Sequence, residues 1–222
     1  MGSEHTPLLE RPMPEPRWPA MLAVISVGLL NDALPRSLVI GPPRLITVLA
    51  VVLLVPALIS HHKGKHDAAK WLSYIALSLV TVSMVGSLAL LVSGLATHKQ
   101  GPSELLASAT LLWISNILVF ASWYWRLDAG GPHMRDIRAA HTGGAFLFPQ
   151  MTLDPALRKQ MCEHNWRPGF VDYLFLAFNT STAFSPTDAP VLSRWAKLLM
   201  MVQAAISLAT LALLAARAVN IL

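Results

Sequence analysis

The residues of this chain that are best placed to do chemistry form a polar turn between two apolar segments near the C-terminus. Hydroxyls, backbone carbonyls and a carboxylate can replace part of the water shell of an ion. At membrane depth such a turn is tolerated only where protein buries it or where it lines a water-filled cavity. The pattern therefore predicts the passage of ions or small solutes. The candidate residues, from the end of the first segment through the turn, are Thr180, Thr182, Ala183, Phe184, Ser185, Pro186, Thr187 and Asp188.

The elements that must position this turn are a short apolar helix, Phe170–Thr182, and a long apolar helix that follows it to Leu222. A stripe of residues spaced by three or four, and mostly polar, lies on one face of the long helix. One interpretation is that this stripe faces water in a pore. The other is that its Gln, Ser and Thr side chains hydrogen-bond to neighbouring helices. The stripe consists of Gln203, Ser207, Thr210, Leu214 and Arg217.

Residues Tyr173–Lys197 resemble the pore helix, selectivity filter and start of the inner helix of the potassium-channel pore-loop superfamily. The family's filter follows a Thr-rich stretch and reads Thr-Val-Gly-Tyr-Gly-Asp. Here the stretch Asn179-Thr180-Ser181-Thr182 precedes the turn, and Asp188 matches the family's Asp. A Pro-Val step matches Pro190-Val191, and an aromatic residue followed by a basic one matches Trp195 and Lys197. The resemblance implies a symmetric homotetramer, because one pore loop per chain cannot enclose a pore.

The turn departs from the family at the positions of the two filter glycines. Those glycines permit the backbone angles that aim carbonyls into the pore, but this chain has Ser185 and Thr187 there, with Pro186 between them. Proline fixes φ and has no N–H. We therefore expect a wider, hydrated constriction without strong potassium selectivity, or a loop plugged by the ring of Phe184. The helix Lys197–Leu222 contains no Gly or Pro, so no hinge is expected in it.

Composition places the chain in a membrane. Of its 222 residues, 54% are hydrophobic and 13% are charged, and the mean hydropathy is +0.51, whereas soluble domains are about 25% charged. The net charge of +5 is typical of loops that face anionic headgroups, and no basic face for nucleic acid is evident. The one cysteine, Cys162, excludes an internal disulfide. No motif for a cofactor, a metal or catalysis is found, so no enzyme is expected.

The whole chain also resembles a family of small bacterial membrane proteins, which implies no activity. Residues 1–17 are expected to be a disordered tail, 18–127 a transmembrane helical region, 128–169 an extramembrane loop, and 170–222 the pore-like unit. The first apolar stretch, Trp18–Pro35, is short for a span, so it forms either a thin or tilted span or a re-entrant or interfacial helix. The clearer membrane segments are Leu45–Ser60, Trp71–Ala96 and Leu105–Leu127.

Two features lie outside these segments. Within residues 128–169, an amphipathic helix is predicted over Asp154–Asn165, with Asp154 as its cap, and the apolar stretch Ala145–Pro149 is expected to dock on the protein or on the membrane surface. The triplet His61, His62 and His66 could bind a metal from a helix, but a solvated basic loop is the favoured interpretation.

Two arguments about the orientation of the chain in the membrane disagree. The resemblance places the pore loop, the loop of residues 128–169 and the Lys63/Lys65/Lys70 loop on the outer side. The positive-inside rule places the basic Lys63/Lys65/Lys70 loop in the cytoplasm. A pore loop that enters from the cytoplasm would satisfy the charges.

The sequence thus predicts an all-α integral membrane protein with four or five transmembrane helices and a C-terminal re-entrant pore helix and loop. Its expected location is the plasma (inner) membrane. Its expected partners are membrane lipids, inorganic ions and further copies of the chain in a homotetramer. The leading hypothesis is a channel-like protein with weak or altered ion selectivity. The alternative is a non-conducting scaffold or partner-binding subunit that retains a channel-like fold.

Overall fold

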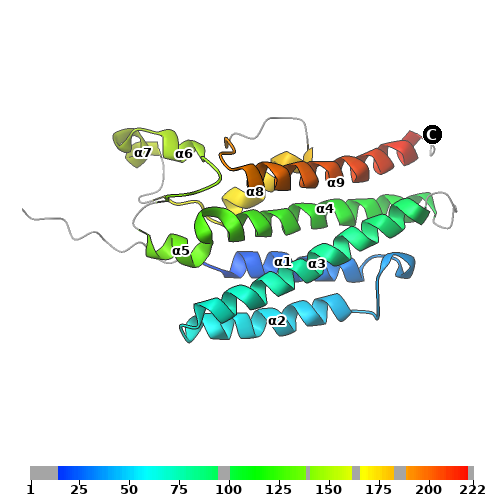
Figure 1. Cartoon of the computed structure of the whole chain (residues 1–222). Helices are drawn as coiled ribbons and strands as arrows, with labels where there is room; N and C mark the ends of the chain where they lie inside the picture. The colour runs from blue at the N-terminus through cyan, green and yellow to red at the C-terminus, as the bar shows by residue number, and fades with distance from the viewer. Residues whose placement is uncertain (1–14, 95–100, 139–140, 162–165, 183–188, 220–222) are drawn as a thin grey trace, which may run out of the picture.

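The computed structural model describes residues 15–94, 101–138, 141–161, 166–182 and 189–219, and in these ranges the chain is helical with no β-strand. Long helices lie side by side along one axis, and short ones gather at one end (Figure 1). In chain order the elements are α1 (Trp18–Asp32), η1 (Arg36–Leu38), α2 (Leu45–His62), α3 (His66–Gly94), α4 (Pro102–Leu127), η3 (Asp128–Gly130), α5 (Pro132–Ile137), α6 (Pro149–Thr152), α7 (Pro155–Met161), α8 (Phe170–Thr182) and α9 (Arg194–Val219).

Four of the described helices, α2, α3, α4 and α9, are long and apolar enough to cross a membrane. The most apolar stretches have a mean hydropathy between 1.8 and 2.3, and a span needs about 20 predominantly apolar residues. The all-α prediction is confirmed for the described chain. α1 has 15 residues and is apolar but shorter.

The helix boundaries follow local sequence signals. Proline stands in the first turn of α1 and of α4, where its missing N–H has no helical partner to lose. α3 begins at His66, five residues before the predicted Trp71, because His66 to Lys70 extend the helix beyond the apolar stretch. Pro56 lies inside α2 without ending it. α7 begins where it was predicted, with the Asp154 carboxylate accepting a hydrogen bond of 2.9 Å from the Ala156 N–H.

The helix α1 is held inside the bundle by small and polar residues. Asn31 is 5% exposed, and its side-chain oxygen accepts hydrogen bonds from Ser83 at 2.9 Å and from Ser87 at 3.4 Å. A Cβ added at Gly28 would lie 2.8 Å from the hydroxyl oxygen of Thr47, so glycine permits the close approach of α1 and α2. The serine pair of α3 therefore serves as a helix contact, as small residues do in membrane bundles.

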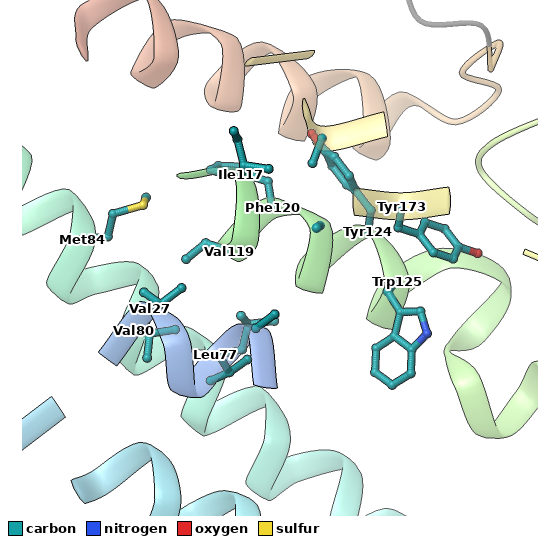
Figure 2. Packing of buried hydrophobic residues seen from close by; sticks show 14 of the residues in the cluster. Val27, Leu77, Val80, Met84, Ile117, Val119, Phe120, Tyr124, Trp125 and Tyr173 are labelled. Atoms are coloured by element: carbon teal, nitrogen blue, oxygen red, sulfur yellow. The ribbon is translucent and has the colours of Figure 1, made fainter. Parts of the chain in front are cut away.

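The core fills the space between α1, α3 and α4. Val27 of α1 meets Leu77 and Val80 of α3, and all three side chains are at most 2% exposed. Figure 2 shows Tyr124 and Trp125 leaving α4 on opposite sides, so that consecutive residues serve two different contacts. Burial of large apolar side chains of this kind is the main favourable term in packing.

The chain places most of its connections at one end of the bundle, which we call the basic end. The start of α1, the α2–α3 turn, η3 with α5 to α7, and the first residues of α8 and α9 all lie there (Figure 1). Contacts across it include the Arg17–Asp136 ion pair at 2.5 Å and the stacked rings of His66 and His133, with centroids 3.8 Å apart. Its described basic residues are Arg17, Lys63, Lys65, Lys70, Arg126, Arg135, Arg138, Arg158, Arg167, Arg194 and Lys197.

Residues 128–169, predicted as one loop, are more ordered than expected. They contribute η3, α5, α6 and α7. The stretch Ala145–Pro149 docks on the protein, as one of its two predicted alternatives stated: Ala145, Phe146 and Phe148 are each at most 4% exposed. Leu147 N–H donates to the carbonyl of Pro190 at 3.0 Å, and Leu192 N–H donates to the carbonyl of Ala145 at 2.8 Å. This backbone pairing fixes the chain just before α9 against the segment just before α6.

Candidate functional site

The helix α8 occupies half the length of the bundle. Its Tyr173 hydroxyl donates to Asp128 beside the C-terminal end of α4 at 2.6 Å, whereas its last turn reaches Asn116 in the middle of α4. α8 therefore runs antiparallel to α4 and ends near mid-bundle, between α4 and α9 (Figure 1). The chain is next described at residues 189–193, back at the basic end, where α9 begins. A half-length helix is thus followed by a return to its starting end and by a full-length helix.

A buried hydrogen-bond network holds the end of α8. The side chain of Gln203 is 0% exposed, and its amide nitrogen donates to the carbonyl of Ala177 at 2.7 Å and to the hydroxyl of Ser181 at 2.8 Å. Its amide oxygen accepts a short hydrogen bond from the hydroxyl of Tyr124. One glutamine thereby joins α9 to both α8 and α4.

The network continues on either side of Gln203. Ser207 donates to the carbonyl of Ser181 at 2.6 Å. Asn116 donates to the carbonyl of Gln203 at 3.3 Å and to the hydroxyl of Ser181 at 3.4 Å. The side-chain oxygen of Asn116 is buried without a hydrogen-bond partner among the described residues.

The predicted stripe of α9 accordingly faces the inside of its own chain. Gln203, Ser207 and Thr210 are at most 1% exposed, and Thr210 donates to the carbonyl of Ser207 at 2.8 Å. The contacts of Gln203 and Ser207 with α8 fit the interhelical hydrogen-bonding interpretation of the stripe, whereas Thr210 bonds within its own helix. Leu214 is half-buried against the core. Arg217 lies in α9, and its side chain is outside the described part.

The filter-like residues are divided by the limits of the described chain. Thr180 donates to the carbonyl of Leu176 at 2.8 Å, and Thr182 to the carbonyl of Asn179 at 3.1 Å, so both hydroxyls return to their own helix. Residues 183–188, which comprise Ala183, Phe184, Ser185, Pro186, Thr187 and Asp188, lie outside the described residues. The prediction of a constriction there stays a prediction.

The outward faces of α8 and α9 are apolar. On α8, Val171 is 71% exposed and Phe175 is 55% exposed. On α9, Leu198, Met201 and Leu208 are each more than 60% exposed. Such faces in a single chain require either lipid or another protein surface to cover them.

Sequence reasoning missed a second polar cluster, which is centred on Asp128 at the end of α4. The carboxylate is 0% exposed and accepts hydrogen bonds from the Tyr173 hydroxyl at 2.6 Å and from the Ala145 N–H. The Nε2 of His141 lies 3.1 Å from it, within ion-pair distance but without hydrogen-bond geometry. Asp128 therefore ties the first turn of α8 and the segment before α6 to α4.

An ion pair between the N-terminal segment and α5 adjoins this cluster. Arg135, which is 5% exposed, donates to Glu15 at 2.8 Å, to the Trp125 carbonyl at 2.7 Å and to the Asp128 carbonyl at 3.0 Å. Burial raises the pKa of Glu15, although the nearby Arg135 guanidinium opposes that shift. The prediction of a disordered tail over residues 1–17 is wrong for these last residues, because Glu15 and Arg17 are both bound to α5.

This arrangement ties the first turn of α8 to the end of α4. No group of three or more His, Cys, Asp or Glu side chains suited to a metal occurs among the described residues. Cys162 and His164 lie outside the described part. Asp128 carried one sequence signal, since it follows the aromatic stretch Trp123–Trp125 by three positions, whereas Arg135 carried none. Their partners come from distant parts of the chain.

Comparisons with known proteins give no relative to argue from: no family model, no curated protein and no solved structure matches this chain.

Proposed function

We propose that this chain is a multi-pass protein of the plasma (inner) membrane whose C-terminal part is a pore loop, and that a homotetramer of it conducts small inorganic ions. The observation that carries the proposal is the placement of α8. This helix stops near mid-bundle beside Ser207 of α9, and the chain returns to the basic end before α9 begins. A full membrane span would not end there.

The end of α8 favours cations. A helix C-terminus carries roughly half a negative elementary charge, and this charge acts within about one turn. Residues 183–188, with hydroxyls and the carboxylate of Asp188, follow directly. Because that turn has Pro186 and no glycine, the proposed passage is hydrated and weakly selective among cations.

The proposed assembly uses the exposed apolar faces of α8 and α9. One chain supplies one half-length helix, so a closed passage needs rotational symmetry. Val171, Phe175 and Met201 are each more than half exposed in the single chain, and subunit contacts would cover a part of these faces.

The burial of the α9 stripe favours a second candidate function. Gln203, Ser207 and Thr210 are enclosed by α4, α8 and their own helix, so none of them offers its side chain to a central pore. A subunit that retains this channel-like fold as a non-conducting scaffold is consistent with that enclosure.

The proposed orientation is inverted relative to the potassium-channel resemblance. The Lys63/Lys65/Lys70 loop, α5 and the starts of α8 and α9 share one end of the bundle (Figure 1). The described chain has fewer basic residues at the other end: Arg36, Arg44 and, near the end of α9, Arg217. The positive-inside rule then places the basic end in the cytoplasm, so the pore loop enters from that side.

Cysteine labelling tests the orientation. With Cys162 replaced by serine, Lys65→Cys and Arg158→Cys should both react with a membrane-impermeant maleimide only after the cytoplasmic side is opened. Reaction of both in intact cells would invert the proposed orientation. Reaction of the two on opposite sides would contradict the fold.

Reconstitution tests the function. Purified protein in a planar bilayer should give stepwise currents, and Asp188→Asn should reduce the preference for cations over anions. Arg158→Gln, at the same end of the bundle but outside the turn, serves as the matched control and should leave the currents unchanged. The scaffold candidate predicts a stable oligomer that carries no current.

A further inference from the structure

A cavity of about 140 Å³ lies at the basic end, among the ends of α1, α2, α3, α4 and α5. Its volume is far larger than the roughly 10–15 Å³ that one water requires. It lies away from the end of α8 and shares none of the residues of the pore-like unit. Its charged side chains and histidines are Arg17, His61, His66, Asp67, Lys70, Arg126 and His133, and Tyr74 also lines it.

Basic side chains outnumber acidic ones in this lining. Asp67 is the one carboxylate in the lining, and Arg17 is already paired with Asp136, which lies outside it. Arg126 forms no ion pair within the described chain; its guanidinium instead lies 5.2 Å from the Trp125 ring and 5.8 Å from the Tyr74 ring. A partly buried guanidinium that has no carboxylate partner can bind an anion.

A second cation approaches the same aromatic ring. The ammonium of Lys70 lies 5.9 Å from the Tyr74 ring, which Arg126 also contacts. Each cation is attracted to the ring, but the two repel each other because they carry the same charge. An anion between them would turn that repulsion into two attractions.

Three histidines form a further part of the wall. The Nδ1 atoms of His61 and His66 lie 3.3 Å apart, and the rings of His66 and His133 are stacked at 3.8 Å. One of the two Nδ1 atoms must be unprotonated for that contact to be a hydrogen bond. Burial, together with the charges of His66 and Arg17, lowers the pKa of His133. These surroundings disfavour the protonated form of His133, which a nearby anion would favour.

Another part of the cavity wall is apolar. Met21 of α1 and Leu54 and Leu58 of α2 line it. A smaller cavity of about 10 Å³ lies beside it and shares Met21, Leu54 and Arg126. The cavity therefore joins cationic side chains to an apolar crevice, a combination that suits the level where headgroups meet acyl chains.

We propose that this cavity binds a phosphate-bearing anion, with Arg126 and Lys70 as its principal partners and the three histidines as auxiliary donors. The anion is either the headgroup of an acidic phospholipid, whose acyl chain would follow the crevice, or free phosphate. This proposal is independent of ion conduction, so the absence of current would leave it standing.

The test is a binding titration of the full chain in detergent, followed by tryptophan fluorescence, since Trp125 lines the cavity. Phosphatidylglycerol, phosphatidylcholine and inorganic phosphate are the three probes. Saturable binding of phosphatidylglycerol but not of the other two identifies a lipid headgroup site. Saturable binding of inorganic phosphate that competes with phosphatidylglycerol identifies a free-anion site. Binding of neither anion, or equal binding of both lipids, overturns the proposal.

Variants locate the binding. Arg126→Gln should weaken anion binding about tenfold or more, because it removes a charge-assisted contact. Lys70→Gln replaces an exposed side chain, so the fold should stay intact. This variant should also weaken anion binding. Arg158→Gln removes a basic residue at the same end outside the cavity and should have no effect. An equal loss in all three variants would show binding to general surface charge and would overturn the site.

Discussion

Replacing Gln203 by leucine is expected to destabilise the protein by about 2 kcal/mol. Its side chain makes hydrogen bonds with Tyr124, Ala177 and Ser181, and it is 0% exposed. Interhelical hydrogen bonds in membrane proteins contribute about 0.6 kcal/mol each on average, with a maximum near 1.7. Leucine has a similar volume, so the cavity term is small, and the loss comes from the three unpaired groups.

The assay is equilibrium unfolding of the purified protein in mixed detergent micelles, followed by tryptophan fluorescence. The matched control is Met201→Leu on the outward face of the same helix, where the side chain is 66% exposed. That change removes no hydrogen bond and should shift the unfolding free energy by less than about 0.5 kcal/mol. The Gln203→Asn variant, which keeps the amide on a shorter side chain, should fall between these two.

A Gln203→Leu variant as stable as the wild type would refute the assignment of this side chain to an interhelical network. A change of conductance without a change of stability would place Gln203 in the pore wall instead. Stability lost together with a normal unit conductance agrees with the enclosed position. The two measurements on one variant therefore separate the two interpretations of the α9 stripe.

Three further substitutions test the basic end. Gly144→Ala should lower the free energy of unfolding by about 1–3 kcal/mol, because the added Cβ would overlap the ring of His141. Gly101→Ala is the control, since a Cβ there meets open space. Equal thermal stability of the two variants would contradict this packing. Burial lowers the pKa of His133 below 6.5, so the unfolded chain binds that proton more tightly and stability should fall as the pH drops below 6.5; His133→Gln should reduce that slope in urea titrations, and an unchanged slope would count against it. Burial raises the pKa of Glu15 above 4.5, so stability should fall as the pH rises from 4.5 towards the folded-state value; Glu15→Gln should remove this slope, and a steeper one would contradict the shift.

Much of the helical architecture is readable from the chain. The apolar stretches at 45–60, 71–96 and 105–127 are long and continuous, so the hydrophobic signal alone locates α2, α3 and α4 to within a few residues. The start of α7 follows from Asp154 before Pro155, which is local chemistry. Signals of this kind need only neighbouring residues, and they are therefore visible in one sequence.

Tertiary partners are not visible in the same way. Glu15 is bound to Arg135 across 120 positions, and nothing in a proline-rich, charged N-terminal stretch indicates that contact. Asp128 is tied to Tyr173 and Ala145, and both arrive through the fold of the segment between α4 and α8. Apolar residues along the chain show where the membrane segments lie, but packing decides which polar residues come into contact.

The α9 stripe illustrates the same limit. Its spacing correctly predicts one polar face on a helix, which is a local property. Whether that face meets water or other helices depends on where α8 ends, and Ser181 supplies the partner of both Gln203 and Ser207. The sequence left both interpretations open because α8 could not be positioned relative to α9 from periodicity.

The most direct test of the proposed function is a single-channel recording of the purified, reconstituted protein, with its oligomeric state measured in the same preparation. The proposal predicts a tetramer and stepwise cation currents that depend on Asp188. A strict monomer, or no current for cations or anions across a wide range of voltage and pH, would contradict it.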